Sequence, residues 1–214
     1  MLSKVLINCE HPYFELMEKG VGRRARKVEI EMKEGINVIV GINGAGKSTF
    51  MQIVRDALLK QQYTDFVNFE FLESFDKDAV KPCYFFKMHD MNPDEQLRQT
   101  MPHDLQKIAY HMQCREMSSG QQMMEVLENI EYLGDNSSLI FIDEPEISLD
   151  GPNMIELVKK LESLAERGVQ VMIISHHPMV VLNNKFNPIQ LNGKYDYAEH
   201  MRKEMLKMLK ITTR

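Results

Sequence analysis

VIVGINGAGKSTF, residues 38–50, places a glycine-rich loop directly after a run of β-branched residues and before a helical pattern. Within it, GINGAGKS matches G-x-x-x-x-G-K-[ST] through Gly41, Gly46, Lys47 and Ser48. Glycines allow the backbone to turn several N–H groups inward, and the helix that follows adds the positive end of its dipole. A plain glycine turn is the alternative, but it would not explain the strand before the loop and the helix after it. The stretch therefore predicts a strand, a phosphate-binding loop and a helix, in that order.

The residues of this loop have separate expected tasks. We expect Lys47 to span the β- and γ-phosphates of a bound nucleotide and to act in catalysis, while Ser48 holds Mg²⁺. The residues expected to contact the nucleotide are Asn43, Gly44, Ala45, Gly46, Lys47, Ser48 and Thr49. The loop thus predicts a nucleotide site that uses a divalent cation.

Composition limits the class of protein. The chain has 214 residues, 43% of them hydrophobic, which is enough to bury a substantial core and argues against a disordered chain. Its net charge of -5 argues against general coating of nucleic acid, although a basic patch at 23–27 could still bind it. No apolar run approaches the ~20 residues needed to cross a bilayer, and the cysteines lack the spacing of a zinc site. We expect a soluble, cytoplasmic protein without a membrane span.

Hydrophobic periodicity gives the expected elements. Short apolar or alternating runs predict strands at 2–8, 28–32, 36–40, 67–71, 83–86, 138–143 and 169–175. Apolar residues at helical spacing predict helices at 48–59, 94–114, 120–133, 153–166 and 198–210. The runs at 138–143 and 169–175 are nearly continuous, which is typical of parallel strands covered on both faces.

The expected fold class is α/β, with a central sheet and a small amino-terminal sheet. We expect one domain over residues 1–214, with a helical subdomain inserted at about 90–134. EKGVGRRARK, residues 18–27, is expected to be a basic turn between two strands. The carboxy-terminal helix is amphipathic, and we expect its apolar side to dock on the domain rather than on a membrane or a partner. That side consists of Met201, Met205, Met208 and Leu209.

Two carboxylates follow the buried strand LIFID. Neighbouring side chains at a strand end point in different directions, so Asp143 can support Mg²⁺ while Glu144 faces an attacking water as the catalytic base. Acids at a strand end are often simply solvent-facing, but the phosphate loop in the same chain favours the catalytic role. SHHP, residues 175–178, follows the next buried strand, and the His176 imidazole could contact the γ-phosphate there and act in catalysis. The alternative for His176 is a satisfied loop residue, and we expect His177 to be structural.

EMSSGQQ, residues 116–122, precedes a predicted amphipathic helix. It offers Ser118, Ser119 and the backbone of Gly120 at the amino terminus of that helix. Plain N-capping is one interpretation of this stretch, and a second anion site is the other. One nucleotide could not easily use both this site and the phosphate loop within a single chain.

Five elements occur in the order found in ABC-type ATPases. They are the phosphate loop at 41–48, MSSGQ at 117–121, LIFIDE at 139–144, SLD at 148–150 and His176. The chain resembles this family over roughly residues 30–180. The resemblance implies a P-loop NTPase fold with a mixed central sheet, an amino-terminal antiparallel sheet and a small helical subdomain. It also implies that the protein is an ATPase, with ATP as the nucleotide and Mg²⁺ as the cation.

In this family two subunits meet head to tail, and the serine-glycine motif of each closes on ATP held by the opposite phosphate loop. The resemblance implies that Ser118, Ser119 and Gly120 bind the γ-phosphate in trans and that Asp150 communicates across the interface. The expected assembly is an ATP-dependent homodimer or pseudo-symmetric heterodimer that opens after hydrolysis.

The sequence also departs from the family pattern. Met117 and Ser119 replace a leucine and a glycine of the motif, and no glutamine follows the strand at 83–86 as a second metal contact. Tyr13 and Phe14 are candidates for stacking on adenine. The residues EPE, the doubled serine and SHHP look more like the SMC and OLD-like branch of the family than like transporters.

Three functions are compatible with these motifs. The first, favoured by the likeness to the SMC and OLD-like branch, is an ATPase whose dimerisation controls a separate DNA-related or defence effector protein. Nucleic-acid binding is left open. The second is the ATP-binding subunit of a membrane transporter, which the short span between Lys47 and Ser118 disfavours because it leaves little helical subdomain. The third is a non-hydrolysing clamp, which the complete Asp143 and Glu144 pair disfavours.

Overall fold

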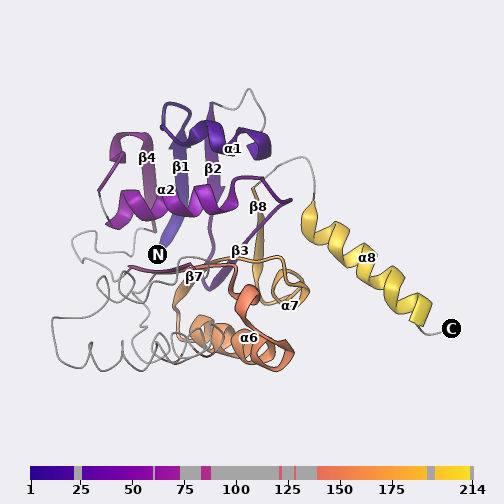
Figure 1. The fold of residues 1–214 in the computed structure, drawn as a ribbon. Helices are drawn as coiled ribbons and strands as arrows, with labels where there is room; N and C mark the ends of the chain where they lie inside the picture. The colour runs from indigo at the N-terminus through magenta and orange to yellow at the C-terminus, as the bar shows by residue number, and fades with distance from the viewer. Residues whose placement is uncertain are drawn as a thin grey trace.

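The computed structural model describes residues 1–21, 26–59, 61–72, 83–87, 121, 128, 139–191 and 196–212. These residues form an α/β fold with two sheets, which confirms the expected fold class (Figure 1). The amino-terminal sheet is antiparallel and has the order β2-β1-β4. Its strands are β1 at Leu2–Asn8, β2 at Lys27–Glu31 and β4 at Val67–Phe71.

The central sheet has the order β5-β6-β7-β3-β8. Its strands are β3 at Ile36–Val40, β5 at Cys83–Lys87, β6 at Leu139–Asp143, β7 at Gln170–Ile174 and β8 at Asn187–Gln190. All the described pairings in this sheet are parallel, so the expectation of a mixed central sheet is wrong for the described part of the chain. Antiparallel pairing there is confined to the amino-terminal sheet. The sequence pattern does not predict β8, because its four residues include a proline and carry little apolar alternation.

Helices cover both faces of the central sheet (Figure 1). The helices are α1 at Phe14–Val21, α2 at Lys47–Leu59, α6 at Gly151–Glu166, α7 at Pro178–Val181 and α8 at Tyr197–Thr212. Short 3₁₀ turns lie at Thr64–Phe66 (η1) and Pro145–Ser148 (η3). The helices α1 and α2 pack with the amino-terminal sheet on one face, and α6 and α7 pack on the other.

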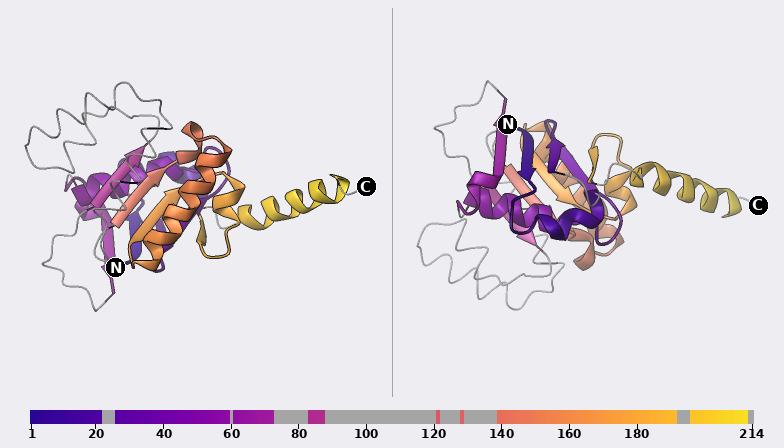
Figure 2. Two further views of the ribbon diagram at one scale, coloured as in Figure 1. Left: turned by 90° about the horizontal axis from the view of Figure 1, so that it is seen from below. Right: turned by 90° about the horizontal axis from the view of Figure 1, so that it is seen from above.

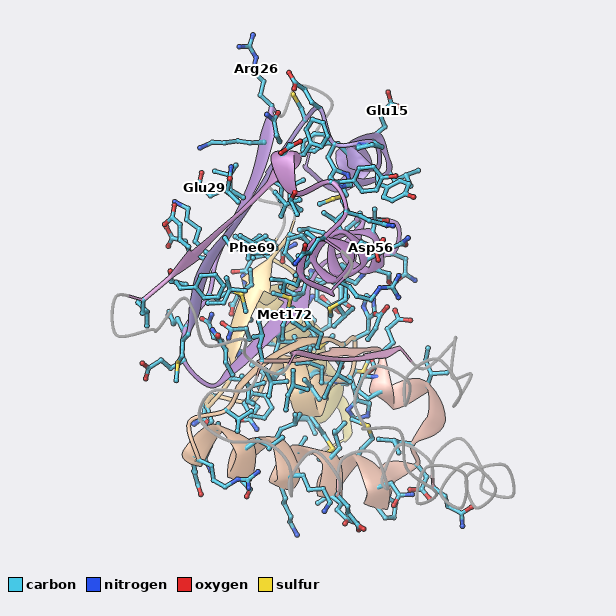
Figure 3. All side chains as sticks on the ribbon, turned by 90° about the vertical axis from the view of Figure 1, so that its left-hand side faces the viewer. Glu15, Arg26, Glu29, Asp56, Phe69 and Met172 are labelled. Carbon is cyan, nitrogen blue, oxygen red and sulfur yellow. The ribbon has the colours of Figure 1, made fainter. Side chains whose placement is uncertain are left out.

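The strands of the central sheet divide their side chains between two cores. In β7, Met172 and Ile174 belong to the core shared with α2 and the amino-terminal sheet, whereas Val171 and Ile173 belong to the core shared with α6. This alternation follows from the two-residue period of a strand. Figure 3 shows Met172 in the middle of the molecule, between the two layers. The expectation of strands covered on both faces is therefore confirmed.

One buried glutamine connects the two sheets. Gln170, at the start of β7, is 2% exposed. Its amide oxygen accepts a hydrogen bond from the backbone N–H of Leu2 at 2.9 Å, and its amide nitrogen donates to the backbone oxygens of Leu2 at 2.7 Å and Lys33 at 3.0 Å. A buried amide that meets its partners in this way fixes how the first strand sits on the central sheet.

Part of the expected basic turn is helical instead. The predicted turn at 18–27 overlaps α1, which ends at Val21. The helix forms because Phe14 and Met17 are fully buried in the core beside α2, and this packing outweighs the glycine near its end. Residues 22–25 lie outside the described residues.

The helix α1 packs directly against the loop at 41–46. A Cβ on Gly46 would lie 2.9 Å from the Cα of Met17, which is closer than non-bonded atoms can approach. Gly46 and Gly44 both have positive φ angles, of 85° and 78°, but a Cβ on Gly44 would meet no atom within 4 Å. The two glycines therefore share a backbone requirement, and only Gly46 also has a packing requirement.

The last helix does not dock its apolar side, so that expectation is wrong. The described part of α8 extends away from the body of the protein in all the ribbon views (Figures 1 and 2). Only its first turns pack, through Tyr197, Ala198 and Met201. Met205, Leu206, Met208 and Leu209 are 36%, 51%, 66% and 59% exposed. No helix in the described ranges is long and apolar enough to cross a membrane.

The predicted helical subdomain at about 90–134 lies outside the described residues, apart from Gln121 and Glu128. Its existence and its boundaries stay predictions. The division of the chain into one domain of 1–214 also stays a prediction.

Leucine truncation will distinguish the packed helix from the projecting one. Leu161→Ala, in α6, removes a fully buried side chain and is expected to lower the free energy of unfolding by about 2–5 kcal/mol. Leu206→Ala, in α8, removes a side chain that is 51% exposed, and it should change the free energy of unfolding by less than about 0.5 kcal/mol. Urea denaturation of both variants measures the difference. Similar losses would show that α8 docks on the domain in solution.

Alanine substitutions at the two loop glycines will separate backbone strain from packing. Both introduce a side chain at positive φ, which costs about 1 kcal/mol. Gly46→Ala also forces the contact with Met17, so it should lose at least about 1 kcal/mol more than Gly44→Ala. Chemical denaturation of the two variants gives both values. Equal losses would mean that α1 does not pack on the loop.

Candidate functional site

The loop at 41–46 connects the end of β3 to the start of α2, as the sequence predicts. The backbone N–H of Ala45 donates to the Ile42 oxygen at 3.1 Å, which closes the loop, and Ala45 is buried. Asn43 and Gly44 are exposed at its tip. The loop, and the helix that begins directly after it, form the concave arrangement that can hold an anion.

Lys47 lies folded against this loop. Its side chain is buried, with the residue 6% exposed, and Nζ donates to the backbone oxygens of Gly41 at 3.1 Å and Ile42 at 3.2 Å. Burial lowers the pKa of Lys47 from its usual value, and the nearby carboxylates of Glu144 and Asp143 oppose the shift. The ammonium group therefore sits at the loop with two replaceable hydrogen bonds.

Asp143 and Ser48 are 95 residues apart in the sequence, and the fold brings their side chains together. The Ser48 hydroxyl, in the first turn of α2, donates to Oδ1 of Asp143, at the end of β6, at 3.5 Å. Asp143 is 4% exposed. No group of three or more histidine, cysteine or acidic side chains that could hold a metal occurs among the described residues. A hydroxyl and a carboxylate fit Mg²⁺, which takes few protein ligands and shares the rest with phosphate and water.

Glu144 has an unusual backbone conformation. Its φ is 51° and its ψ is 56°, in the left-handed region that residues with a Cβ rarely adopt. The conformation ends β6 and starts η3, and the Glu144 N–H still donates to the Ile174 oxygen at 2.9 Å. Such strain persists where the surrounding structure holds it, and it concentrates at functional sites.

His176 lies beside Glu144. Its Nε2 is 3.9 Å from Oε1 of Glu144, and its Nδ1 is 3.0 Å from the hydroxyl of Tyr197. The backbone N–H of His176 donates to Oε1 of Glu146. Burial, followed by the charge of Lys47, lowers the pKa of His176 from its usual value, so the ring is neutral at pH 7. The structure thus brings the three predicted catalytic residues, Lys47, Glu144 and His176, to one place.

Two other predicted residues have local roles. His177 is structural, as expected, because its Nδ1 accepts from the backbone N–H of Met179 and caps α7. The Asp150 carboxylate caps α6 by accepting from the backbone N–H of Asn153 at 3.0 Å. Communication across an interface by Asp150 stays a prediction.

The structure leaves some predicted contacts untested and removes one candidate. Ser118, Ser119 and Gly120 lie outside the described residues. Phe14 is 2% exposed within the core, so stacking of Phe14 on adenine is wrong. Tyr13 is partly buried between His11 and Tyr63 and stays a candidate. Thr49 lies in the first turn of α2, where the nucleotide contact stays a prediction.

Sequence reasoning missed three polar residues at this site. They are Glu146, Gln190 and Tyr197. Glu146 could have been suspected, since it stands two residues after the predicted pair of Asp143 and Glu144. Gln190 and Tyr197 carry no local signal, because they stand in a short strand and at the start of a helix, outside the motifs that predict the site.

Comparisons with known proteins find similar sequences among ATP-binding proteins. The galactose/methyl galactoside import ATP-binding protein MglA 1 of Photobacterium profundum is 25% identical over 70% of this chain and 36% of its own length. The energy-coupling factor transporter ATP-binding protein EcfA2 of Streptococcus sanguinis is 24% identical over 70% of this chain and 64% of its own. The match thus spans about a third of the length of the first relative and just under two thirds of the length of the second. No family model matches the chain.

The fold has solved counterparts. The structure of cbiO1 from Clostridium perfringens, part of the ABC transporter complex cbiONQ, superposes with a TM-score of 0.56 at 13% identity. The match covers 100% of this chain and 96% of that one. Together with the phosphate loop, the Asp143 carboxylate and His176 at adjacent strand ends, this likeness identifies the architecture. The chain has the fold of the nucleotide-binding domain of ABC-type ATPases.

Proposed function

We propose that the protein binds ATP with Mg²⁺ and hydrolyses it between two head-to-tail subunits. The observation that carries this proposal is the convergence of Lys47, the Ser48 and Asp143 pair, Glu144 and His176 at one edge of the central sheet. These are the groups needed to hold a triphosphate, to hold its cation and to activate a water.

Each residue has a task in binding. Phosphate oxygens replace the two backbone oxygens that Lys47 contacts, and the ammonium group then neutralises phosphate charge. Ser48 and Asp143 hold Mg²⁺ through oxygen atoms. When bound, Mg²⁺ would withdraw charge from the phosphate oxygens.

Glu144 acts as the general base in hydrolysis. Water attacks the γ-phosphorus, its proton passes to the Glu144 carboxylate, and the bond from that phosphorus to the bridging oxygen of ADP breaks. The His176 ring lies on the same side, with Nε2 near the carboxylate, and it orients the water or the γ-phosphate. A clamp that never hydrolyses ATP would have no use for this pair.

The rim of the site supports a second subunit. Ile42 is 47% exposed in the phosphate loop, Ile147 is 51% exposed in η3 and Met179 is 39% exposed in α7. Each lies within three residues of a proposed site residue, so three segments of the site carry an exposed apolar side chain. Burial of these side chains against a partner chain is favourable. We infer that the motif with Ser118, Ser119 and Gly120 of the second subunit covers them, in a homodimer or a pseudo-symmetric heterodimer.

The coupled process is proposed from the relatives. The two curated relatives are named as ATP-binding proteins of import or transport systems, which favours the ATP-binding subunit of a membrane transporter. An ATPase that controls a DNA-related or defence effector is the second candidate, because the EPE, doubled-serine and SHHP residues favour it. Co-purification distinguishes them, since the first requires an integral membrane protein and the second a soluble effector or nucleic acid.

Glu144→Gln is expected to trap an ATP-bound dimer. The amide keeps the size of the side chain but cannot accept the proton, so turnover should fall by about 100-fold or more while ATP binding remains. Phosphate release measures turnover, and size-exclusion chromatography with light scattering measures mass with and without Mg²⁺ and ATP.

The matched control is Glu156→Gln, on the exposed side of α6, which should behave as the wild type. Ser118→Ala combined with Ser119→Ala in the Glu144→Gln background should abolish the dimer. A monomer of Glu144→Gln under both conditions would overturn the two-subunit arrangement, and unchanged turnover would overturn the role of Glu144.

A further inference from the structure

We propose that Tyr197 is a positioning residue for His176, and that its hydroxyl donates to Nδ1 so that the ring presents an Nε2–H group toward the reacting phosphate. The inference rests on the proposed function for its catalytic consequence. The arrangement of the two side chains is a property of the protein without nucleotide.

Two contacts define where the His176 ring lies. The Tyr197 hydroxyl is 3.0 Å from Nδ1, within hydrogen-bonding distance. The two rings also meet edge to face, with centroids 5.6 Å apart and an interplanar angle of 77°. The hydrogen bond fixes the rotation of the imidazole, and the ring contact fixes its tilt.

Tyr197 is itself held on the strand beside the phosphate loop. Its backbone N–H donates to Oε1 of Gln190 at 3.0 Å. Gln190 ends β8 and pairs with Val40, the last residue before the loop. The amide nitrogen of Gln190 lies 3.7 Å from where a Cβ on Gly41 would stand. Tyr197 therefore connects the start of the loop to His176.

The surroundings of the ring select its tautomer. A hydroxyl can donate or accept, so its contact with Nδ1 alone allows either tautomer. The other nitrogen, Nε2, is buried, has no hydrogen-bond partner among the described residues and is 3.9 Å from Oε1 of Glu144. An N–H group facing a carboxylate is favourable, whereas a bare lone pair facing it is not. The proton therefore belongs on Nε2, Nδ1 accepts, and Tyr197 donates.

This tautomer has a chemical consequence. An Nε2–H group can donate to an anionic phosphate oxygen, while the other tautomer would oppose it with a lone pair. The burial of the ring, which favours its neutral form, makes the choice of tautomer matter. By donating to Nδ1, the Tyr197 hydroxyl stabilises the tautomer that the Glu144 carboxylate favours, and it thus acts on catalysis without touching the substrate.

Nuclear magnetic resonance of the nucleotide-free protein tests the arrangement. Two-bond ¹H–¹⁵N correlation of the imidazoles, assigned with His176→Gln, should show His176 protonated on Nε2 in the wild type. In Tyr197→Phe, which keeps the ring packing and removes the hydroxyl, the Nδ1-protonated form should become populated. A wild-type ring protonated on Nδ1, or an unchanged ring in Tyr197→Phe, would overturn the inference.

Steady-state kinetics test the consequence. Tyr197→Phe should lower kcat for ATP about three- to tenfold, the effect of one hydrogen bond, and leave KM within about twofold. The control Ser3→Ala removes a hydroxyl that donates to the backbone oxygen of Glu70 in the amino-terminal sheet, and it should change neither value. An unchanged kcat in Tyr197→Phe would overturn the positioning role. Absence of turnover in the wild type would instead overturn the proposed function, and the spectra would still decide the arrangement.

Discussion

The parallel pairing of β6, β7 and β3 is the constraint on which the site depends. In the register of the sheet, Asp143 lies opposite Ile174, and Ile174 lies opposite Ile39. The three strands therefore end together, and the next two residues of each chain segment supply Glu144, His176 and the start of the phosphate loop. Because parallel strands need crossovers, these groups come from separate segments, and the phosphate loop lies about a hundred residues before Glu144 in the sequence. A shift of one strand by one residue would turn its side chains to the opposite face.

The amino-terminal sheet and α1 support the phosphate loop from one face of the central sheet. The amino-terminal sheet attaches to the central sheet through the buried amide of Gln170, and it brings α1 over the phosphate loop. The close approach of Met17 to Gly46 means that the loop is held between two layers rather than projecting from one. Rigid support of this kind is what a site needs when the groups that it aligns belong to different elements.

Much of the site follows from local pattern. The glycine loop, the acids after LIFID and His176 are identifiable because each directly follows a buried strand, and strand ends meet at one edge of a parallel sheet. The projection of α8 was not predictable in this way. An amphipathic pattern says that a helix has an apolar side, but not which surface covers it. The contacts of Tyr197 with His176 and Gln190 are equally hidden, because they join residues that only the folded chain brings together.

The left-handed backbone at Glu144 has a consequence for how this protein could change over generations. A residue with a Cβ is held there at a cost of about 1 kcal/mol, which glycine would not incur and asparagine would incur less. Selection for heat resistance alone would therefore favour glycine or asparagine at this position and discard the carboxylate. A glutamate in that conformation lowers the stability of the fold and places a carboxylate beside His176.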